Sequence, residues 1–220
     1  MYRYLLFDLD GTLTDSSEGI CKSIQYSLGK IGIQEDDLKK LEVFIGPPLR
    51  YSFKEYYGLE GELAEQAIAF YRERYTEVGK YENRPYPGIR EMLIHLKAAG
   101  AVLAVASSKP ELYVEDILRH FDLYELFDYV VGSDLGGKRE TKTAVIREAM
   151  ERMQVTREEQ KGVLMVGDRH FDIDGAKELS LDSLGVYYGF AKSGELEAAG
   201  ADYVVHTVDE LEKLLLEKLV

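Results

Sequence analysis

Residues 4–14, with the sequence YLLFDLDGTLT, place two aspartates directly after a short apolar run. Successive side chains on a strand point to opposite faces, so Asp8 and Asp10 should project to the same side where this strand ends. Two carboxylates this close together are unfavourable unless a cation lies between them or one of them is protonated. Since oxygen ligands suit Mg²⁺, the pattern predicts a magnesium site. A hairpin turn closed by Asp-Gly is the alternative, but a helical pattern follows and not a second strand.

The composition indicates a folded protein that does not bind nucleic acid or insert into a membrane. The chain has 220 residues, of which 45% are hydrophobic and 30% are charged. No apolar run approaches the roughly 20 residues that span a bilayer, and the N-terminus lacks the features of a signal peptide, so we expect a cytoplasmic location. The net charge of −13 disfavours nucleic acid polymers and anionic membranes as partners. A phosphate site in so acidic a chain needs local positive charge from a metal, lysines and arginines.

Residues 15–87 predict a helical insertion after this first strand. Apolar residues recur every three or four positions in four stretches, and the Gly-Pro-Pro sequence at 46–48 breaks the pattern in the middle. No strand pattern is present in this segment. We therefore expect two domains: a discontinuous core formed by residues 1–14 and 88–220, and a four-helix domain formed by residues 15–87.

Apolar runs alternate with helical patterns after residue 88. The predicted strands are 101–106, 129–131, 163–166, 184–188 and 203–205, and the predicted helices are 89–96, 112–121, 145–153, 171–179 and 208–219. Unbroken apolar strands between helices are typical of a parallel sheet that is covered on both faces. The predicted fold class is therefore α/β, with a doubly wound, Rossmann-like parallel sheet.

Polar residues follow three of the apolar runs. Asp8 follows the first, Ser107 follows the run 101–106, and Asp168 follows the run 163–166 after one glycine. Ligands of doubly wound sheets bind at the carboxyl ends of the strands. We therefore expect these three side chains to lie around one point.

The sequence resembles the haloacid dehalogenase-superfamily phosphatases over its whole length. The four motifs of that family correspond to residues 8–12 (DLDGT), Ser107, Lys142 and residues 167–172 (GDRHFD). A helical insertion between the first two motifs resembles the C1-type cap of the phosphoglycolate phosphatase-like and 5′-nucleotidase-like branch. The resemblance implies an Mg²⁺-dependent hydrolase that acts on a small phosphorylated metabolite, either a nucleoside 5′-monophosphate or a phosphoglycolate-like compound.

The first motif carries the chemical step in this resemblance. Asp8 would be the nucleophile that forms an aspartyl-phosphate. Asp10 would be the general acid that protonates the leaving alcohol and then the base for the hydrolytic water. Gly11 and Thr12 would shape a sharp turn whose backbone N–H groups face the phosphate.

The second and third motifs would bind the phosphoryl group. Ser107 and Ser108 would contact its oxygens, although Ser107 could instead cap the helix that begins near residue 111. Lys142 would pair with Asp8 and with the phosphate. Lys138 is the alternative, and we prefer Lys142 because it opens a helical pattern.

The metal would be held by residues of the first and fourth motifs. The resemblance implies ligands from the carboxylates of Asp8 and Asp168 and from the backbone carbonyl of Asp10. Asp172 lies one helical turn beyond Asp168, and we expect it to act through water or to support a ligand. Asp172 could instead be an acid favoured near a helix N-terminus.

The helical insertion carries the candidates for substrate selection. Eight of the sixteen tyrosines lie between residues 26 and 86, where they form either the core of this domain or a stacking surface for a base or sugar. The loop 46–50 is the best candidate for substrate contact. Arg50 would reach a distal anionic group, or it would be an ordinary solvated helix residue.

Two rival functions deserve comparison with the phosphatase. A β-phosphoglucomutase-like phosphomutase would return a phosphorylated isomer, but Thr12 is typical of phosphatases. A signalling module would keep a phosphate on Asp8, but such a switch needs no helical insertion. For the phosphatase we expect a monomer or a weak homodimer.

Overall fold

The computed structural model describes residues 1–134 and 139–219, and the chain forms two compact units. The core unit contains Met1–Thr14 and Pro85–Val220, and the helical unit contains Asp15–Arg84. The core unit therefore resumes at Pro85, a few residues before the position that the sequence predicts. Each unit buries its own set of apolar side chains.

Six parallel strands form the sheet of the core unit, in the order β5-β4-β1-β6-β7-β8. Their bounds are β1 Tyr4–Phe7, β4 Val102–Pro110, β5 Tyr129–Ser133, β6 Val163–Gly167, β7 Asp182–Val186 and β8 Tyr203–Val205. Neighbouring strands pair in parallel, and β1 lies between β4 and β6. The parallel α/β fold is confirmed, and its central strand is the one that ends at Asp8.

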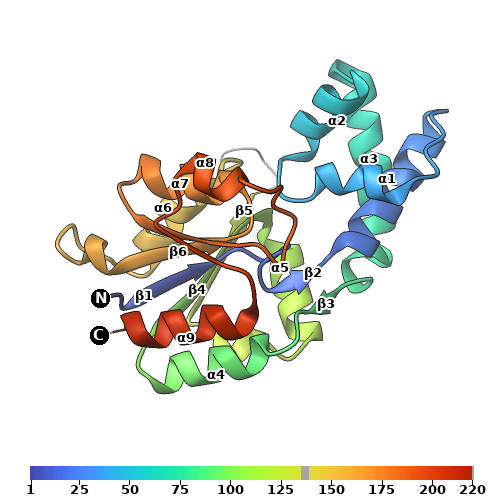
Figure 1. Cartoon of the computed structure of the whole chain (residues 1–220). Helices are drawn as coiled ribbons and strands as arrows, with labels where there is room; N and C mark the ends of the chain where they lie inside the picture. The colour runs from blue at the N-terminus through green and yellow to red at the C-terminus, as the bar shows by residue number, and fades with distance from the viewer. Residues whose placement is uncertain (135–138, 220) are drawn as a thin grey trace. The chain divides into compact units, whose positions relative to one another are not determined.

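Helices cover both faces of this sheet, as Figure 1 shows. They are α4 (Ile89–Ala98), α5 (Glu111–His120), α6 (Lys142–Arg152), α7 (His170–Glu178), α8 (Glu195–Ala199) and α9 (Val208–Lys218). Leu5 and Phe7 of β1 belong to a buried cluster with residues of α4, α5 and α9, whereas Leu6 belongs to a second cluster with residues of α6 and α7. Because successive strand residues point to opposite faces, β1 must be apolar on both sides, which explains its unbroken apolar run.

The helical unit consists of α1 (Ser17–Lys30), η1 (Leu38–Phe44), α2 (Leu49–Tyr57), α3 (Gly61–Glu77) and η2 (Gly79–Tyr81). Of the four predicted helical pieces, the second is a 3₁₀ helix, and η2 is additional. The α2 helix ends at Tyr57 and is followed by Gly58, whose φ of 65° suits a glycine. Ser27 Oγ donates a hydrogen bond of 2.6 Å to the carbonyl of Ala67, which links α1 to α3.

Some elements differ from the sequence prediction. The strands β2 (Thr14–Asp15) and β3 (Arg84–Pro85) pair with one another, although residues 15–87 show no strand pattern, because two residues are too few to display an alternation. The β4 strand continues to Pro110 and does not stop at Ala106. The short helices η3 (Tyr124–Leu126), η4 (Glu159–Gly162) and α8 also have no predicted counterpart.

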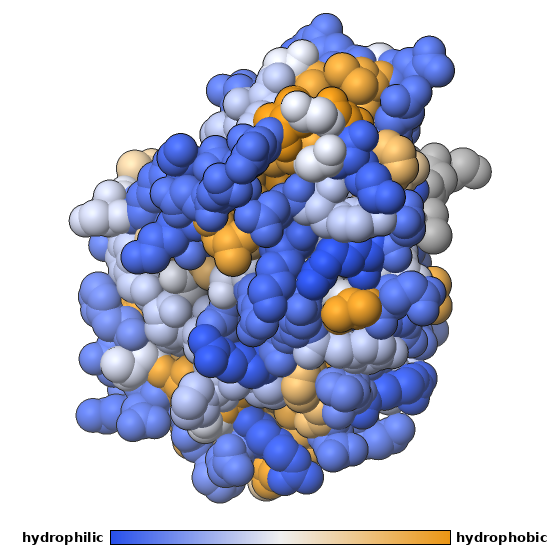
Figure 2. All heavy atoms as spheres, turned by 90° about the vertical axis from the view of Figure 1, so that its right-hand side faces the viewer, coloured by the Kyte–Doolittle hydropathy of each residue, from blue (hydrophilic) through white to orange (hydrophobic). Residues whose placement is uncertain are grey.

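The exposed apolar side chains of the core unit are scattered. The large ones include Ile94, Leu112 and Leu216, which lie on three different helices. Hydrophilic side chains predominate on the face drawn in Figure 2. Within residues 1–134 and 139–219, none of the helices has the length and apolar character that a membrane span requires.

Candidate active site

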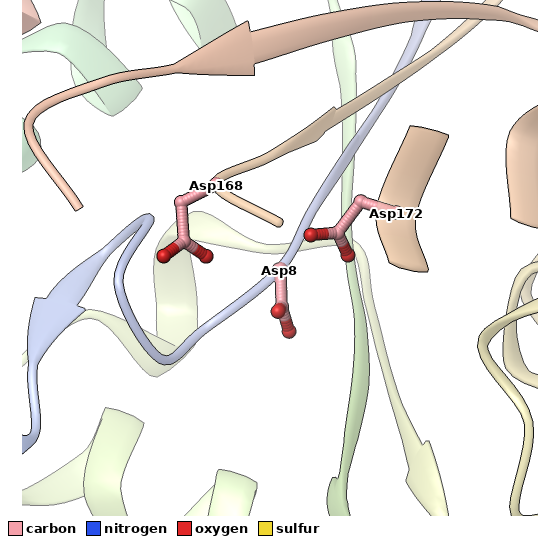
Figure 3. A group of neighbouring side chains, drawn as sticks. All are labelled: Asp8, Asp168 and Asp172. Atoms are coloured by element: carbon pink, nitrogen blue, oxygen red, sulfur yellow. The ribbon is translucent and has the colours of Figure 1, made fainter. Parts of the chain in front are cut away.

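Three buried carboxylates meet at the carboxyl ends of β1 and β6. Asp8 directly follows β1, Asp168 directly follows β6, and Asp172 lies in the first turn of α7. One carboxylate oxygen from each lies within 4.8 Å of the others, and Figure 3 shows the three side chains converging from these elements. Their exposed fractions are 4%, 0% and 1%, respectively. Two adjacent parallel strands and one helix start thus concentrate negative charge at one point.

Lys142 supplies positive charge to this group from the first residue of α6. Its Nζ lies 2.9 Å from Asp8 Oδ1 and 2.7 Å from Asp172 Oδ1, and it donates a hydrogen bond of 3.1 Å to the carbonyl of Ala106. Thr141 fixes this position, because its side chain accepts a hydrogen bond from Ala144 N and so caps α6. The alternative candidate, Lys138, lies outside the described residues.

Burial is the largest single influence on the pKa values of Asp168, Asp172 and Lys142. Burial raises the pKa of Asp168 well above its ordinary value, and the charges of Asp172 and Asp8 raise it further. Burial also raises the pKa of Asp172, against the opposing effect of Lys142. Burial lowers the pKa of Lys142, but the two carboxylates outweigh it, so this pKa lies above its ordinary value. The carboxylates therefore need further positive charge to be ionised together.

Asp172 has two structural roles at once. Its Oδ2 accepts a hydrogen bond of 3.1 Å from Arg169 N at the start of α7, while Oδ1 faces Lys142. A Cβ on Gly167 would lie 2.1 Å from Asp172 Cγ, so only glycine permits this approach. Asp172 is therefore both a helix-start acid and a member of the buried charged group.

The turn after Asp10 takes the sharp form expected from its glycine. Gly11 has a φ of 79°, and a Cβ on it would lie 2.1 Å from Asp168 Oδ2. Gly11 N donates to the carbonyl of Thr14, and Thr12 N donates to the carbonyl of Leu9. Because both amides are used inside the turn, the expectation that they face a phosphate is not supported, and their role is to shape the turn.

A segment after β7 that the sequence did not indicate also holds the site together. Phe190 N donates a hydrogen bond of 2.8 Å to Asp168 Oδ2, and Tyr188 donates one of 2.9 Å from its hydroxyl to the carbonyl of Thr12. A Cβ on Gly189 would lie 2.2 Å from the carbonyl oxygen of Gly11. The glycine between two aromatic residues is the only sequence signal for this close approach.

Ser107 lies in the extended part of β4 and is buried, with 1% exposed. Its Oγ accepts a hydrogen bond of 3.3 Å from Lys109 N, and Ser108 is partly exposed. The alternative that Ser107 caps α5 is wrong, because Pro110 occupies the N-cap position. Ser107 thus stays beside the carboxyl end of the strand, where a ligand would lie.

Lys109 is the charged residue of the site that the sequence reasoning missed. Its Nζ lies 2.8 Å from Asp10 Oδ2, and the exposed fractions of the two side chains are 6% and 9%. Asp10 Oδ1 is buried and makes no hydrogen bond to any described residue. A lysine two positions after Ser107 was the available signal, but β4 was expected to end before it.

The donor set fits a divalent cation. The buried carboxylates of this region belong to Asp8, Asp10, Asp168 and Asp172. The buried ammonium groups belong to Lys109 and Lys142. With all four carboxylates ionised, this set among the described residues has two formal negative charges in excess, which one Mg²⁺ would cancel. The donors are oxygen atoms, the type that Mg²⁺ prefers. In addition, Asp10 Oδ1 is buried without a hydrogen-bond partner among the described residues, which agrees with a shortage of positive charge at this site.

The remaining candidates belong to the helical unit. Arg50 lies in α2, and its Nη2 forms an ion pair of 2.7 Å with Glu65 Oε1, with 64% of the arginine side chain exposed. Its contact with a distal anionic group stays a prediction. Tyr71 and Tyr75 are buried and stacked, with ring centroids 5.1 Å apart, whereas other tyrosines are exposed, namely Tyr51, Tyr56 and Tyr81. The tyrosines therefore include both core and surface positions.

Comparison with known proteins shows the family to which this chain belongs. A family model described as haloacid dehalogenase-like hydrolase matches residues 5–186. A 5′-nucleotidase from Pseudomonas aeruginosa is 44% identical over 90% of this chain and 88% of its own length. A tyrosine-protein kinase, PtkA from Mycobacterium tuberculosis, is 37% identical over 97% of this chain and 72% of its own length.

A further relative and a solved structure agree with this family. A phosphoglycolate phosphatase from Aquifex aeolicus is 30% identical over 99% of both chains. The crystal structure of a predicted phosphatase from Clostridium acetobutylicum is 50% identical and covers 99% of both chains, with a TM-score of 0.94.

Proposed function

This chain is a phosphatase of the haloacid dehalogenase-like hydrolase family, and from this premise we propose that it hydrolyses a small phosphomonoester with Mg²⁺ through an aspartyl-phosphate on Asp8. The observation that carries the proposal is the buried group of Asp8, Asp168 and Asp172 with Lys142 ion-paired to Asp8. Phosphoryl transfer needs positioning and cancellation of charge more than it needs a strong nucleophile. This group can provide both.

In the first half-reaction, Asp8 attacks phosphorus and displaces the alcohol. Leu9 N and Lys142 Nζ both contact Asp8 Oδ1, so we assign the attack to Oδ2. The bond from Oδ2 to phosphorus forms while the bond from phosphorus to the ester oxygen breaks. Asp10 gives its proton to that departing oxygen.

In the second half-reaction, water replaces Asp8. The Asp10 carboxylate takes a proton from the water, the water oxygen bonds to phosphorus, and the bond between phosphorus and Asp8 breaks. Inorganic phosphate leaves and both aspartates return to their initial states. A phosphatase differs from a signalling module in that this second step is fast.

The magnesium ion would be held by the carboxylates of Asp8 and Asp168 and by the backbone carbonyl of Asp10. When bound, Mg²⁺ supplies positive charge that offsets the charge of the phosphoryl group. Asp172 would act through water or by holding Lys142, which it contacts at 2.7 Å. Lys142 would reach from Asp8 to the phosphoryl oxygens.

Ser107 and Ser108 would donate hydrogen bonds to the phosphoryl oxygens. Ser107 is buried at the end of the apolar part of β4, and its Oγ accepts a hydrogen bond from Lys109 N, so its O–H would serve as the donor for this contact. Removing one such donor typically costs about 10²–10³-fold in rate. Loss of Ser107 should therefore impair turnover, whereas loss of Asp8 should abolish it.

We propose a nucleoside 5′-monophosphate as the preferred substrate and a phosphoglycolate-like compound as the second choice. The 44% identity to a 5′-nucleotidase supports this order. We further propose that the helical unit is a C1-type cap that selects the substrate. Its exposed Tyr51, Tyr56 and Tyr81 suit stacking on a base, and Arg50 suits a distal anionic group.

A second candidate activity is transfer of the phosphoryl group to a tyrosine hydroxyl. It is favoured by the similarity to PtkA, which extends over 97% of this chain. The chemistry would differ in the acceptor, since a phenolic oxygen would replace water. Phosphotyrosine formation from a nucleoside triphosphate, in the absence of phosphate release from monoesters, would support this candidate.

The proposal is tested by measuring phosphate release from a panel of monoesters, with Mg²⁺ and with chelator. The panel contains nucleoside 5′-monophosphates, phosphoglycolate and hexose phosphates. We expect Mg²⁺-dependent release in the unmodified protein and none in Asp8→Asn, while Asp174→Asn, a matched change at an exposed aspartate paired with His170, keeps its activity. Release of no phosphate from any substrate would contradict the proposal, and a phosphorylated isomer in place of phosphate would indicate a phosphomutase.

A further inference from the structure

We infer that Lys109 is a positioning residue for Asp10, and that it determines which carboxylate oxygen carries the proton for the leaving group. The inference rests on the proposed function, in which Asp10 is the general acid. Lys109 lies outside the four motifs that carry the family resemblance, and its position is visible only in the folded chain.

An irregularity in β4 brings Lys109 to this position. Ala106 pairs with Val131 of β5, but the next paired residue of β4 is Pro110, opposite Ser133. Extra residues of β4 are therefore inserted opposite a shorter stretch of β5, as in a β-bulge. Bulges change the direction of a side chain and are common beside active sites. The hydrogen bond from Lys109 N to Ser107 Oγ stabilises the backbone of this bulge.

The contact between Lys109 and Asp10 is short and buried. Nζ lies 2.8 Å from Asp10 Oδ2, and only 6% of the lysine side chain is exposed. Both charges have lost most of their water, so each depends on the other, and removal of one leaves the other uncompensated. The second oxygen, Asp10 Oδ1, makes no hydrogen bond to a described residue.

This asymmetry between the two oxygens has a chemical consequence. An ammonium group has three donors and no acceptor, so the oxygen that Lys109 contacts must act as an acceptor. When Asp10 is protonated, this contact favours the proton on Oδ1, because a carbonyl oxygen is a better acceptor for the ammonium group than a hydroxyl oxygen. Lys109 thus holds the carboxyl group in one orientation, with the proton on the oxygen that no other described residue engages.

The two lysines of the site contact different aspartates. Lys142 contacts Asp8 and Asp172, whereas Lys109 contacts Asp10. A lysine that served mainly as a counter-charge for the phosphoryl group would affect all monoesters alike. A lysine that positions Asp10 should affect kcat/KM, which reports the steps up to departure of the alcohol, only where the leaving group needs a proton; the later attack of water, in which Asp10 is the base, is common to all substrates.

The test compares two substrates in a Lys109→Met variant. An alkyl phosphate has a leaving alkoxide that needs a proton, while p-nitrophenyl phosphate has a leaving phenolate that is stable without one. We expect kcat/KM to fall by about 10²-fold for the alkyl phosphate, the low end of the range for general acid catalysis, and to change little for the aryl phosphate. Lys109→Arg keeps a donor and should recover much of the alkyl phosphate activity.

Both kcat/KM values are measured on one preparation of each variant. A reduced fraction of folded protein lowers both values equally and therefore cancels in their ratio. Lys97→Met is the matched control, since Lys97 also pairs with an aspartate, Asp128, at 3.0 Å, and it should leave the ratio unchanged. Equal losses of kcat/KM on the two substrates, or a loss on the alkyl phosphate that appears only in KM, would overturn the inference. Failure of the proposed function is distinct: the unmodified protein would then release phosphate from neither substrate.

Discussion

Lys142 Nζ lies 2.9 Å from Asp8 Oδ1, and the same nitrogen lies 2.7 Å from Asp172 Oδ1. One buried ammonium group therefore joins the end of β1 to the start of α7. The three side chains come from distant parts of the sequence, and the parallel sheet brings them together. Together with Lys109, which contacts Asp10, Lys142 provides the local positive charge that a phosphate site in this acidic chain needs.

Replacing Lys142 with methionine should abolish turnover and destabilise the core unit. Removing one partner of a buried ion pair typically costs about 3–5 kcal/mol, and Lys142 is only 5% exposed. Lys142→Arg should retain more stability because it keeps the charge. Urea unfolding and phosphate release measure the two effects, with the exposed Lys161→Met as control; a Lys142→Met protein with unchanged stability and activity would refute the assignment.

Binding of Mg²⁺ should stabilise the protein against thermal unfolding. A ligand at 100 times its dissociation constant contributes about 2.7 kcal/mol. Asp168→Asn should lose this shift, whereas Asp174→Asn should keep it. An equal Mg²⁺ shift in Asp168→Asn would mean that the ion binds elsewhere.

The same variant has an expected effect without metal. Burial and neighbouring charges raise the pKa of Asp168, so the folded protein loses stability as pH rises through that raised pKa. In metal-free buffer at neutral pH, Asp168→Asn should therefore unfold at the same temperature as the unmodified protein or a higher one. A lower unfolding temperature in chelator would show that the ionised carboxylate is already compensated.

The sequence was sufficient to predict the sheet and the meeting of Asp8 with Asp168. Each residue ends an apolar run, and the carboxyl ends of adjacent parallel strands lie together, so the argument needed only the strand pattern. Lys142 was predicted from the resemblance and from the helical pattern that it opens. Its partner Asp172 was expected near the site for a different reason, since it lies one helical turn beyond Asp168 in the sequence.

Other parts of the site depend on local geometry that side-chain patterns do not report. Lys109 was missed because β4 continues through an irregular stretch, in which apolar and polar residues do not alternate as they do in a regular strand. The hydrogen bond from Phe190 N to Asp168 involves a backbone donor, which every residue except proline possesses. The amides of Gly11 and Thr12 were expected to face a ligand, but the turn itself uses them.

Gly189→Ala should reduce activity strongly. The new Cβ would lie 2.2 Å from the carbonyl oxygen of Gly11 and 2.6 Å from Asp168 Cβ, so the loop or the first motif must move. Gly162→Ala is the control, because its Cβ would meet nothing closer than 3.9 Å. Steady-state kinetics on both variants measures the difference, and full activity in Gly189→Ala would show that the site tolerates a shift of this loop.

The helical unit should lose stability in acid through Glu82. Hydrogen bonds from Arg74, at 2.7 and 3.0 Å, lower the pKa of Glu82 below its ordinary value. The contribution is therefore complete above the unfolded-state pKa of about 4.3 and is lost as pH falls towards the lower folded-state pKa. Glu82→Gln should cost about 1–2 kcal/mol at neutral pH, and this difference should shrink in acid.

Urea unfolding of Glu82→Gln at several pH values tests this effect. Glu55→Gln, at an exposed position of α2, provides a control for the loss of one negative charge. A cost of Glu82→Gln that stays constant down to about pH 3, well below the ordinary glutamate pKa, would rule out an ionic origin.

The most direct test of the central claim is the identity and lifetime of the covalent intermediate. Turnover of a nucleoside 5′-monophosphate with Mg²⁺ is quenched in acid at successive times, and the digested protein is analysed for phosphoryl groups by mass spectrometry. We predict a phosphoryl group on the peptide that contains Asp8, lost within seconds as inorganic phosphate is released, and absent in Asp8→Asn. A phosphoryl group on another residue, or one that persists on Asp8 for many minutes, would contradict hydrolysis through Asp8.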